Sequence, residues 1–485
     1  MSDSLWTMTA CQVADALSAG ELVPADLLAA LEARIARVDP AVNALPTLCM
    51  DRARAVLERN GDRIAAAPLH GLPVPIKDSY RVEGVRTTWG SLVFDDHVAE
   101  RSDYAVEAIE RAGGLVYAKT NTPEFEAGAN TFNEVFGATL NPWDTNRSAA
   151  GSSGGAAVAV ATGMAFIAQG SDFACSLRYP AAFCGVVGLR PTPGLVPQGP
   201  SAMPYQALSV TGPLARSVAD TGLALDAMAA FEPGDPLTAP HTPAHYRRSA
   251  ERPTRPARAA YSETLGLATV STPVREVVGA AIGAAEREGC AIVRADPDLA
   301  DAHPVFRTLR AFQFAVSYAH VLQNHRERLK PEVAWNIEQG LELTSMDLAT
   351  AERGRAMLRQ SMLDFLDRYG LLVAPTAPVA PGPVTERFVA HIEGIEMVSY
   401  LDWLVLGYAI SVTGCPAISV PCGFTSAGLP VGLQIVAPPH AEAELLQSAA
   451  WFEEVLSARL DKPIDPVAVP SGPQTDVTRG GGHSC

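Results

Sequence analysis

Hydrophobic positions alternate between helical and strand spacing along most of the chain. After Pro24, apolar residues recur at helical spacing (Leu27, Leu28, Leu31, Ile35 and Val38), which predicts a helix beginning at Val23-Pro24. The first strand pattern covers 72–76, a helix follows from Ser102-Asp103, and the next strand pattern covers 115–119. This alternation predicts an α/β protein with a large mixed, mostly parallel β-sheet covered by helices on both faces.

The same patterns divide the chain into consecutive parts. Helical patterns dominate the N-terminal part and a long insertion, whereas strand patterns dominate the two parts that form the sheet core. A connection rich in proline, threonine and charge precedes the insertion, and the polar, glycine-rich tail is predicted to be disordered. The expected parts are an N-terminal helical layer (1–65), the first part of the core (66–232), the connection (233–256), the largely helical insertion (257–370), the core return (371–470) and the tail (471–485).

The stretch from Ala149 to Pro191 carries two polar turns around an apolar segment. The first turn is Gly151-Ser152-Ser153-Gly154-Gly155, the apolar segment covers 156–168, and the second turn is Gly170 to Ser176. Glycine tolerates backbone angles that other residues avoid, so such a turn can direct several backbone N–H groups at one point. This arrangement suits negative charge on a phosphate or on an oxyanion.

Three interpretations compete for this stretch. A phosphate-binding P-loop requires a lysine after the glycines, and none is present. The string GSSGG also fits GxSxG, which would make Ser153 the nucleophile of an α/β-hydrolase, but that nucleophile must follow a strand, and a polar, turn-like segment (141–150) precedes it. The third interpretation combines Ser152, Ser176 and an upstream lysine.

The third interpretation rests on a resemblance to the amidase signature family, whose hydrolases use a Ser–cis-Ser–Lys triad. Ser152 and Ser176 are 24 positions apart, which is the family's spacing, and Lys77 stands in the family's P-x-K-D string. Further similar segments cover most of the chain: RYPAAFCGVVGLRPT (178–192), NTPEF (121–125), NPWD (141–144), GCPAISVPCG (414–423) and GLPVGLQIVAP (428–438).

The resemblance implies a metal-free and cofactor-free amide hydrolase. Ser176 is expected to attack the carbonyl, and Ser152 to pass the proton to a neutral Lys77. The backbone N–H groups of Phe173, Ala174, Cys175 and Ser176 are expected to bind the oxyanion. The family also implies a cis peptide bond at Gly151-Ser152.

Lys77 taken alone would be read as a surface lysine with a buried stem. The apolar segment before it and the resemblance favour a dry site instead, where burial penalises the charged amine. Gly151, Ser153, Asp172 and Arg178 are expected to support the two turns. Asp172 and Arg178 either pair with each other or contact solvent separately.

One departure from the family concerns the residues before Ser176. Relatives usually have Gly-Gly there, whereas this chain has Ala174-Cys175, which we interpret as a narrowed specificity rather than a loss of activity. Aromatic residues in the insertion are more typical of a core than of a pocket, although in relatives this region supplies the wall facing the substrate. They are Phe306, Phe312, Phe314, Tyr318 and Trp335.

Composition and charge limit the classes of partner that the protein is expected to bind. A net charge of −16 argues against broad nucleic-acid or anionic-membrane surfaces, and no apolar stretch reaches the roughly 20 residues of a membrane span. The N-terminal residues show no basic-plus-apolar signal, so a cytoplasmic location with reduced thiols is expected. The eight cysteines form no CxxC pattern, so no metal is expected.

The favoured function is hydrolysis of a small linear amide, with esters as further substrates. The alternatives are an amidotransferase A subunit, which acts as a glutaminase with partner chains on misacylated tRNA, and a non-catalytic binding protein on the same fold. The altered turn, and the lack of an assignable group for glutamine's ammonium and carboxylate, favour the first. The sequence leaves the oligomeric state open, a homodimer included.

Overall fold

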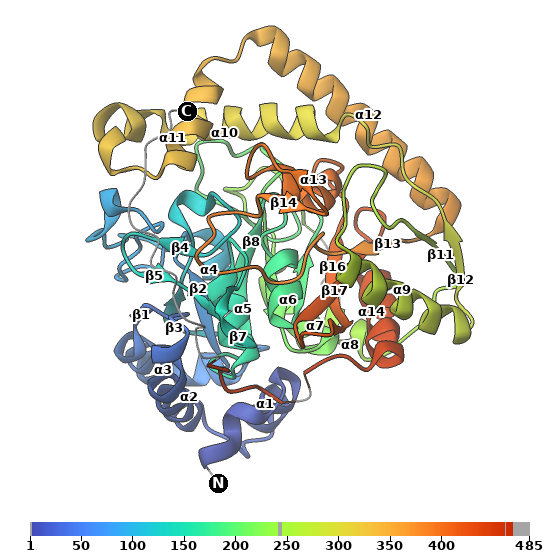
Figure 1. Ribbon diagram of the computed structural model, residues 1–485. Coiled ribbons are helices and arrows are strands. Elements are labelled where there is room, and N and C mark those ends of the chain that lie inside the picture. The colour runs from blue at the N-terminus through green and yellow to red at the C-terminus, as the bar shows by residue number, and fades with distance from the viewer. Residues whose placement is uncertain (1, 241–244, 461, 469–485) are drawn as a thin grey trace.

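A computed structural model describes residues 2–240, 245–460 and 462–468, and its centre is an eight-stranded sheet (Figure 1). The strands lie in the order β12-β11-β13-β17-β16-β9-β10-β8. Their bounds are β8 (Ile167–Asp172), β9 (Val187–Arg190), β10 (Val210–Ala215), β11 (Arg258–Tyr261), β12 (Ala291–Arg294), β13 (Leu372–Pro375), β16 (Ala417–Phe424) and β17 (Pro430–Val436). The α/β class and the mixed sheet are thus confirmed.

The prediction that this sheet is mostly parallel is wrong. Of its seven neighbouring pairs, β11–β12 and β11–β13 are parallel and the other five are antiparallel. The β8–α6–β9 alternation does produce two strands of the same direction, but β10 then inserts between them and runs against both. Similarly, β16 and β17 form a hairpin. Helix–strand alternation does not reveal a strand that is inserted later in the chain.

Two groups of helices cover the sheet. One group contains α5 and α6, which pack on each other, and the other contains α7, α9 and α14. Helix α5 has alanine, valine and glycine at every position and is completely buried, so it reads as apolar all round. The helices are α1 (Ala10–Ser18), α2 (Pro24–Val38), α3 (Met50–Ala65), α4 (Tyr104–Arg111), α5 (Gly154–Ala161), α6 (Arg178–Cys184), α7 (Val218–Met228), α8 (Tyr246–Ala250), α9 (Thr272–Arg287), α10 (Ala302–His325), α11 (Pro331–Leu341), α12 (Ser345–Tyr369), α13 (Val405–Ser411) and α14 (Glu442–Leu456). None of the helices in the described ranges is long and apolar enough to cross a bilayer.

A smaller sheet places Lys77 beside the central one. Its order is β1 (Thr47–Leu48), β3 (Leu115–Thr120) and β2 (Pro73–Lys77), and β2 is buried along its whole length. The Lys77 backbone N–H donates to Gln169 Oε1 on β8 at 3.0 Å, so this side chain links the two sheets. Three short hairpins complete the strands: β4 (Phe132–Asn133) with β5 (Gly137–Ala138), β6 (Leu140–Asn141) with β7 (Asp144–Ser148), and β14 (His391–Ile392) with β15 (Ile395–Glu396).

The region read as an insertion, 257–370, contributes both strands and helices. Strands β11 and β12 with α9 extend the edge of the central sheet, and α10, α11 and α12 follow. Helix α12 lies along the outside of the molecule in Figure 1. The connection 233–256 contains the short helix α8. The tail predicted to be disordered, 471–485, lies outside the described residues.

A buried ion network holds the turn that follows β8, which we call the Ser176 turn (173–177). Asp172 accepts from Arg178 Nε at 3.0 Å and Nη2 at 2.9 Å, and from Arg190 Nη1 at 3.3 Å, and all three side chains are fully buried. The expected pairing of Asp172 with Arg178 is therefore confirmed. Burial raises the pKa of Asp172, but the two guanidinium groups outweigh it and bring the pKa down to about 2.

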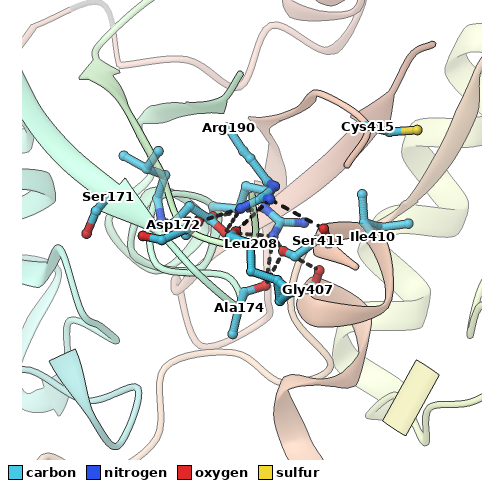
Figure 2. Close-up of polar contacts among 12 residues, drawn as sticks. Ser171, Asp172, Ala174, Arg190, Leu208, Gly407, Ile410, Ser411 and Cys415 are labelled. Carbon is cyan, nitrogen blue, oxygen red and sulfur yellow. Dashed lines mark hydrogen bonds and ion pairs between the residues drawn. The ribbon is translucent and has the colours of Figure 1, made fainter. Parts of the chain in front are cut away.

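The same network holds the backbone of the Ser176 turn from its carbonyl side. Arg178 Nη2 donates to the Ala174 carbonyl at 2.8 Å, and Ser411 Oγ of α13 donates to the same oxygen at 3.0 Å (Figure 2). Arg190 Nη2 donates to the Leu208 carbonyl at 2.9 Å. The network therefore joins β8, β9 and α13 behind the turn.

The residues that replace the family's Gly-Gly fit because α13 has a glycine opposite them. Cys175 is fully buried, and a Cβ at residue 407 would overlap the Cys175 Cβ and come within 2.7 Å of the Ala174 carbonyl oxygen. Neither Ala174 nor Cys175 has a positive φ, so a side chain there causes no backbone strain. The structure thus accommodates the Ala174 and Cys175 side chains in the Ser176 turn in place of two glycines.

We predict that Asp172→Asn destabilises the fold by about 3–5 kcal/mol, because it leaves two buried guanidinium groups without a carboxylate. Urea denaturation of the variant and the wild type measures the difference. The control is Asp15→Asn, whose side chain pairs with Arg247 but is 63% exposed, and which should change the free energy of unfolding by less than about 1 kcal/mol. Equal losses in the two variants would contradict the assigned role of the network.

We predict that Gly407→Ala lowers the free energy of unfolding by about 1–3 kcal/mol through overpacking against Cys175. Adding Cys175→Gly to this variant should recover part of the loss. Gly279→Ala on α9 is the matched control, since no atom lies within 4 Å of the position that a Cβ would take there and alanine favours the helix. Identical behaviour of the two glycine variants in thermal unfolding would show that residues 407 and 175 do not press on each other.

Candidate active site

Four polar side chains meet at the end of β2, where the Lys77 amine lies among three oxygen-bearing groups. Lys77 is fully buried, and its Nζ lies 2.6 Å from Ser152 Oγ, 2.8 Å from Ser171 Oγ and 2.7 Å from Glu126 Oε1. Ser171 Oγ donates in turn to Glu126 at 2.6 Å, and Ser79 Oγ donates to the same carboxylate at 2.7 Å. The Lys77 amine therefore lies within hydrogen-bond distance of three oxygen atoms.

These contacts fix where a neutral amine would place its lone pair. A neutral amine has two N–H donors and one lone pair, and the Glu126 carboxylate can only accept. The Ser171 hydroxyl already donates to Glu126, so toward Lys77 it can only accept as well. With both N–H groups thus engaged, the lone pair is left for the Ser152 hydroxyl. The arrangement is suited to taking a proton from Ser152.

Burial and charge act in opposite directions on the Lys77 amine. Burial lowers the pKa of Lys77 below its ordinary value of 10.5, and the nearby Glu126 and Asp172 carboxylates partly oppose this effect. Burial alone would raise the pKa of Glu126, but Lys77 and the two hydroxyl donors bring it below its ordinary value. Glu126 is thus an ionised group that limits how far the lysine pKa falls.

The first turn places Ser152 and Ser153 with different partners. The Gly151–Ser152 peptide bond is cis, as predicted. Ser153 supports the second turn, because its backbone N–H donates to the Ser176 carbonyl at 3.2 Å and its Oγ donates to the Ser171 carbonyl at 3.2 Å. These bonds tie the two serine turns together.

The Ser176 turn presents free backbone donors. Three carbonyls at its centre are engaged: Ala174 accepts from Arg178 and Ser411, Cys175 from the Tyr179 N–H at 2.8 Å, and Ser176 from the Ser153 N–H. Within the described chain, the N–H groups of residues 173–176 donate to no protein group. Buried N–H groups are almost always paired, and four free donors in one turn are chemically suited to hold a negatively charged oxygen.

Ser176 itself is 7% exposed, and its hydroxyl has no hydrogen-bond partner among the described residues. It borders a small cavity of about 50 Å³, which we call the inner cavity. The Ser152 hydroxyl is held by Lys77 and does not bond to Ser176; catalytic contacts of this kind commonly tighten only when substrate is bound. Burial raises the pKa of the neighbouring Cys175 thiol, which therefore stays protonated.

A larger, outer cavity of about 480 Å³ adjoins the inner one. Phe125, Glu126, Ser209, Gln313 and Tyr318 border both. The insertion helix α10 therefore supplies part of the wall of each cavity. Of the aromatic residues considered in the sequence, Phe314 and Tyr318 border the inner cavity, whereas Phe306 is fully buried and stacks on Tyr408 at 4.4 Å.

Glu126, Ser171 and Arg310 are not recognisable as site residues from the sequence alone. Ser171 lies within the second turn, five residues before Ser176, and Glu126 directly follows NTPEF. Phe125 and Glu126 have φ angles of 44° and 62°, a left-handed backbone that side chains rarely adopt and that turns the carboxylate toward Lys77. The one sequence feature that could have pointed to Glu126 is its position directly after NTPEF, a segment that resembles the family.

Comparison with known proteins shows the family of this chain. The family model for Amidase matches residues 26–446. An acylamidase from Rhodococcus erythropolis is 35% identical over 96% of this chain and 99% of its own length, and the A subunit of glutamyl-tRNA(Gln) amidotransferase from Moorella thermoacetica is 33% identical over 93% and 97%. The solved structure of 6-aminohexanoate cyclic dimer hydrolase with its substrate has a TM-score of 0.84 at 28% identity, covering 93% of this chain and 97% of that one. The chain belongs to the amidase signature family of amide hydrolases.

Proposed function

We propose that this protein hydrolyses linear carboxylic amides through an acyl-enzyme on Ser176, with Lys77 as the base and Ser152 as the proton carrier. The observation that carries the proposal is the buried contact of 2.6 Å between Lys77 Nζ and Ser152 Oγ, beside a turn with free N–H donors. No metal or cofactor takes part in the proposed reaction.

Acylation begins when Ser176 Oγ attacks the amide carbonyl carbon. Its proton passes to Ser152 Oγ while Ser152 gives its own proton to the Lys77 lone pair. The carbonyl oxygen becomes an oxyanion held by the N–H groups of residues 173–176, each worth about 3–4 kcal/mol of barrier by analogy with other oxyanion sites. The C–N bond then breaks as the nitrogen takes a proton from Ser152, which Lys77 restores.

Deacylation repeats these steps with water in place of Ser176. Water loses its proton to Ser152 and attacks the acyl carbon, and the second tetrahedral intermediate collapses. The carboxylic acid leaves, and the proton returns to Ser176. Gly151 and Ser153 hold the first turn in this scheme, and the Asp172–Arg178 pair holds the second. Esters of similar shape would follow the same path, since only the leaving atom differs.

The main alternative is an amidotransferase A subunit, which the relative from Moorella thermoacetica represents. The acylamidase relative has a slightly higher identity over almost the whole of both chains, and the Ala174-Cys175 turn differs from the family pattern of Gly-Gly. These observations favour a hydrolase that acts alone on a small molecule. A non-catalytic binding protein is disfavoured because the Ser176 turn remains open to the inner cavity.

The decisive experiment assays the purified chain alone for release of amine from a panel of amides with different acyl groups. We expect turnover by the wild type, loss of fluorophosphonate labelling in Ser176→Ala, and a fall in kcat of about 10²–10⁴-fold in Lys77→Met, the range for removal of a general base. Circular dichroism shows whether each variant is folded. Full turnover by folded Lys77→Met would refute the proposed base, and an inactive, unlabelled wild type would favour the alternatives.

A second prediction concerns the pH dependence of acylation. The neutral form of Lys77 is the active one, so kcat/KM should rise with pH as its ammonium loses a proton. The Glu126 charge raises the pKa of Lys77, so Glu126→Gln should move the acid limb of the profile to lower pH. Glu124→Gln is the control, since Glu124 accepts from Ser91 and from the Lys330 N–H and does not contact Lys77. An acid limb that moves upward, or that moves equally in the control, would contradict this role of Glu126.

A further inference from the structure

The inner cavity contains a buried guanidinium that lacks an acidic partner. Arg310, on α10, is 5% exposed and borders the cavity together with Ser176. Among the described residues, no carboxylate oxygen lies within 4.0 Å of its nitrogen atoms. Arg178 and Arg190, which are buried nearby, share Asp172. Buried charges are normally paired or bound to a ligand, so an unpaired guanidinium beside a reacting serine requires an explanation.

The contacts of Arg310 hold the guanidinium in place without neutralising it. Nε donates to Asn336 Oδ1 at 3.2 Å and to the Tyr400 hydroxyl at 3.1 Å, and Nη2 donates to the same hydroxyl at 3.0 Å. The guanidinium carbon lies 4.5 Å from the ring centre of Phe314 and 5.2 Å from that of Phe173. Nη1 donates no hydrogen bond to any described residue. The group is therefore fixed in position, with donors left over.

The other charged group on the inner cavity is already engaged. Glu126 lies 2.7 Å from Lys77 Nζ and accepts two serine hydroxyls, and it is not within ion-pair distance of Arg310. When Lys77 is neutral, the Lys77–Glu126 pair has a net charge of −1. Asp172, Arg178 and Arg190 together have a net charge of +1, so these two groups balance each other. The positive charge of Arg310 is then uncompensated, and a bound anion would balance it.

The position of Arg310 also indicates which half of the substrate it meets. In the proposed reaction the departing nitrogen takes its proton from Ser152, beside Lys77 and Glu126. Glu126 borders both cavities, whereas Arg310 borders the inner cavity and not the outer one. An amine half directed from Glu126 into the outer cavity would leave the inner cavity, with Arg310, to the acyl half.

We propose that Arg310 binds a carboxylate on the acyl half of the substrate, so that the preferred substrates are monoamides of short dicarboxylic acids. This inference rests on the proposed amide hydrolysis and adds its substrate class. A planar guanidinium with free N–H groups matches a carboxylate in geometry as well as in charge. The aromatic rings around it exclude water and strengthen the pairing. Asn336 and Tyr400 are positioning residues for the guanidinium.

The test compares matched chromogenic amides that differ only at the end of the acyl chain: succinyl- against butyryl-p-nitroanilide, and glutaryl- against pentanoyl-p-nitroanilide. The wild type should prefer the carboxylate in at least one pair by about 10- to 100-fold in kcat/KM, the range expected for a hydrogen bond to an ionised group. Arg310→Met should abolish this preference, and Arg310→Lys should retain part of it. A wild type without preference in either pair would overturn the inference while leaving amide hydrolysis intact.

Arg307→Met is the matched control, because Arg307 lies one turn earlier on α10, is exposed and packs over Trp335 away from the inner cavity. It should keep the wild-type preference. Binding is measured separately by calorimetric titration of Ser176→Ala with glutarate and with pentanoate. Glutarate should bind more tightly than pentanoate, and adding Arg310→Met should remove the difference. Equal binding of the two acids would overturn the inference, whether or not the anilides are hydrolysed. Failure to hydrolyse any of the four anilides would count against the proposed hydrolysis and not against the carboxylate site.

Discussion

The proposed chemistry depends on the complete burial of the Lys77 amine at the junction of two sheets. An exposed lysine is an ammonium at neutral pH and cannot accept a proton, whereas burial favours its neutral form. Gln169 links the backbone of β2 to β8, and Ser171 and Glu126 hold the amine so that its lone pair is directed at Ser152. The polar side chains at the end of β2 thus surround one desolvated nitrogen.

A second network separates the donors of the Ser176 turn from its acceptors. The carbonyls of Ala174, Cys175 and Ser176 all accept hydrogen bonds from inside the protein. The donors are the side chains of Arg178 and Ser411 and the backbone N–H groups of Tyr179 and Ser153. Once these carbonyls point into the protein, the N–H groups of the same turn must point the other way. The charges of Asp172, Arg178 and Arg190 therefore have a structural role, which is to keep the donors of the turn fixed before any substrate arrives. The Asp172 charge also raises the pKa of Lys77.

Charge is distributed unequally between the two cavities. Glu126 lies where they meet, with its charge directed at Lys77, and Arg310 lies in the inner cavity without a carboxylate partner among the described residues. The inner cavity that Ser176 borders therefore carries one group of each sign. In the proposed reaction this asymmetry would orient an unsymmetrical substrate, with an anionic acyl group toward Arg310. Helix α10 supplies Arg310, so the proposed specificity and the proposed catalysis reside on different elements of the fold.

The sequence by itself determined the family and the α/β class, predicted elements such as α2, α4, β2 and β3, and singled out Lys77, Ser152, Ser176, Asp172 and Arg178 as candidate site residues. These features depend on local periodicity or on contiguous motifs, which are fully present in the order of residues. Only the tertiary structure decided that β10 inserts between β8 and β9, because pairing between distant strands leaves no local pattern. It also decided that Gly407 makes room for Cys175, and that Glu126 and Arg310 border the same cavity as Ser176. A charged residue looks alike in sequence whether it faces solvent or a dry site, and its environment is created by segments that lie far away along the chain.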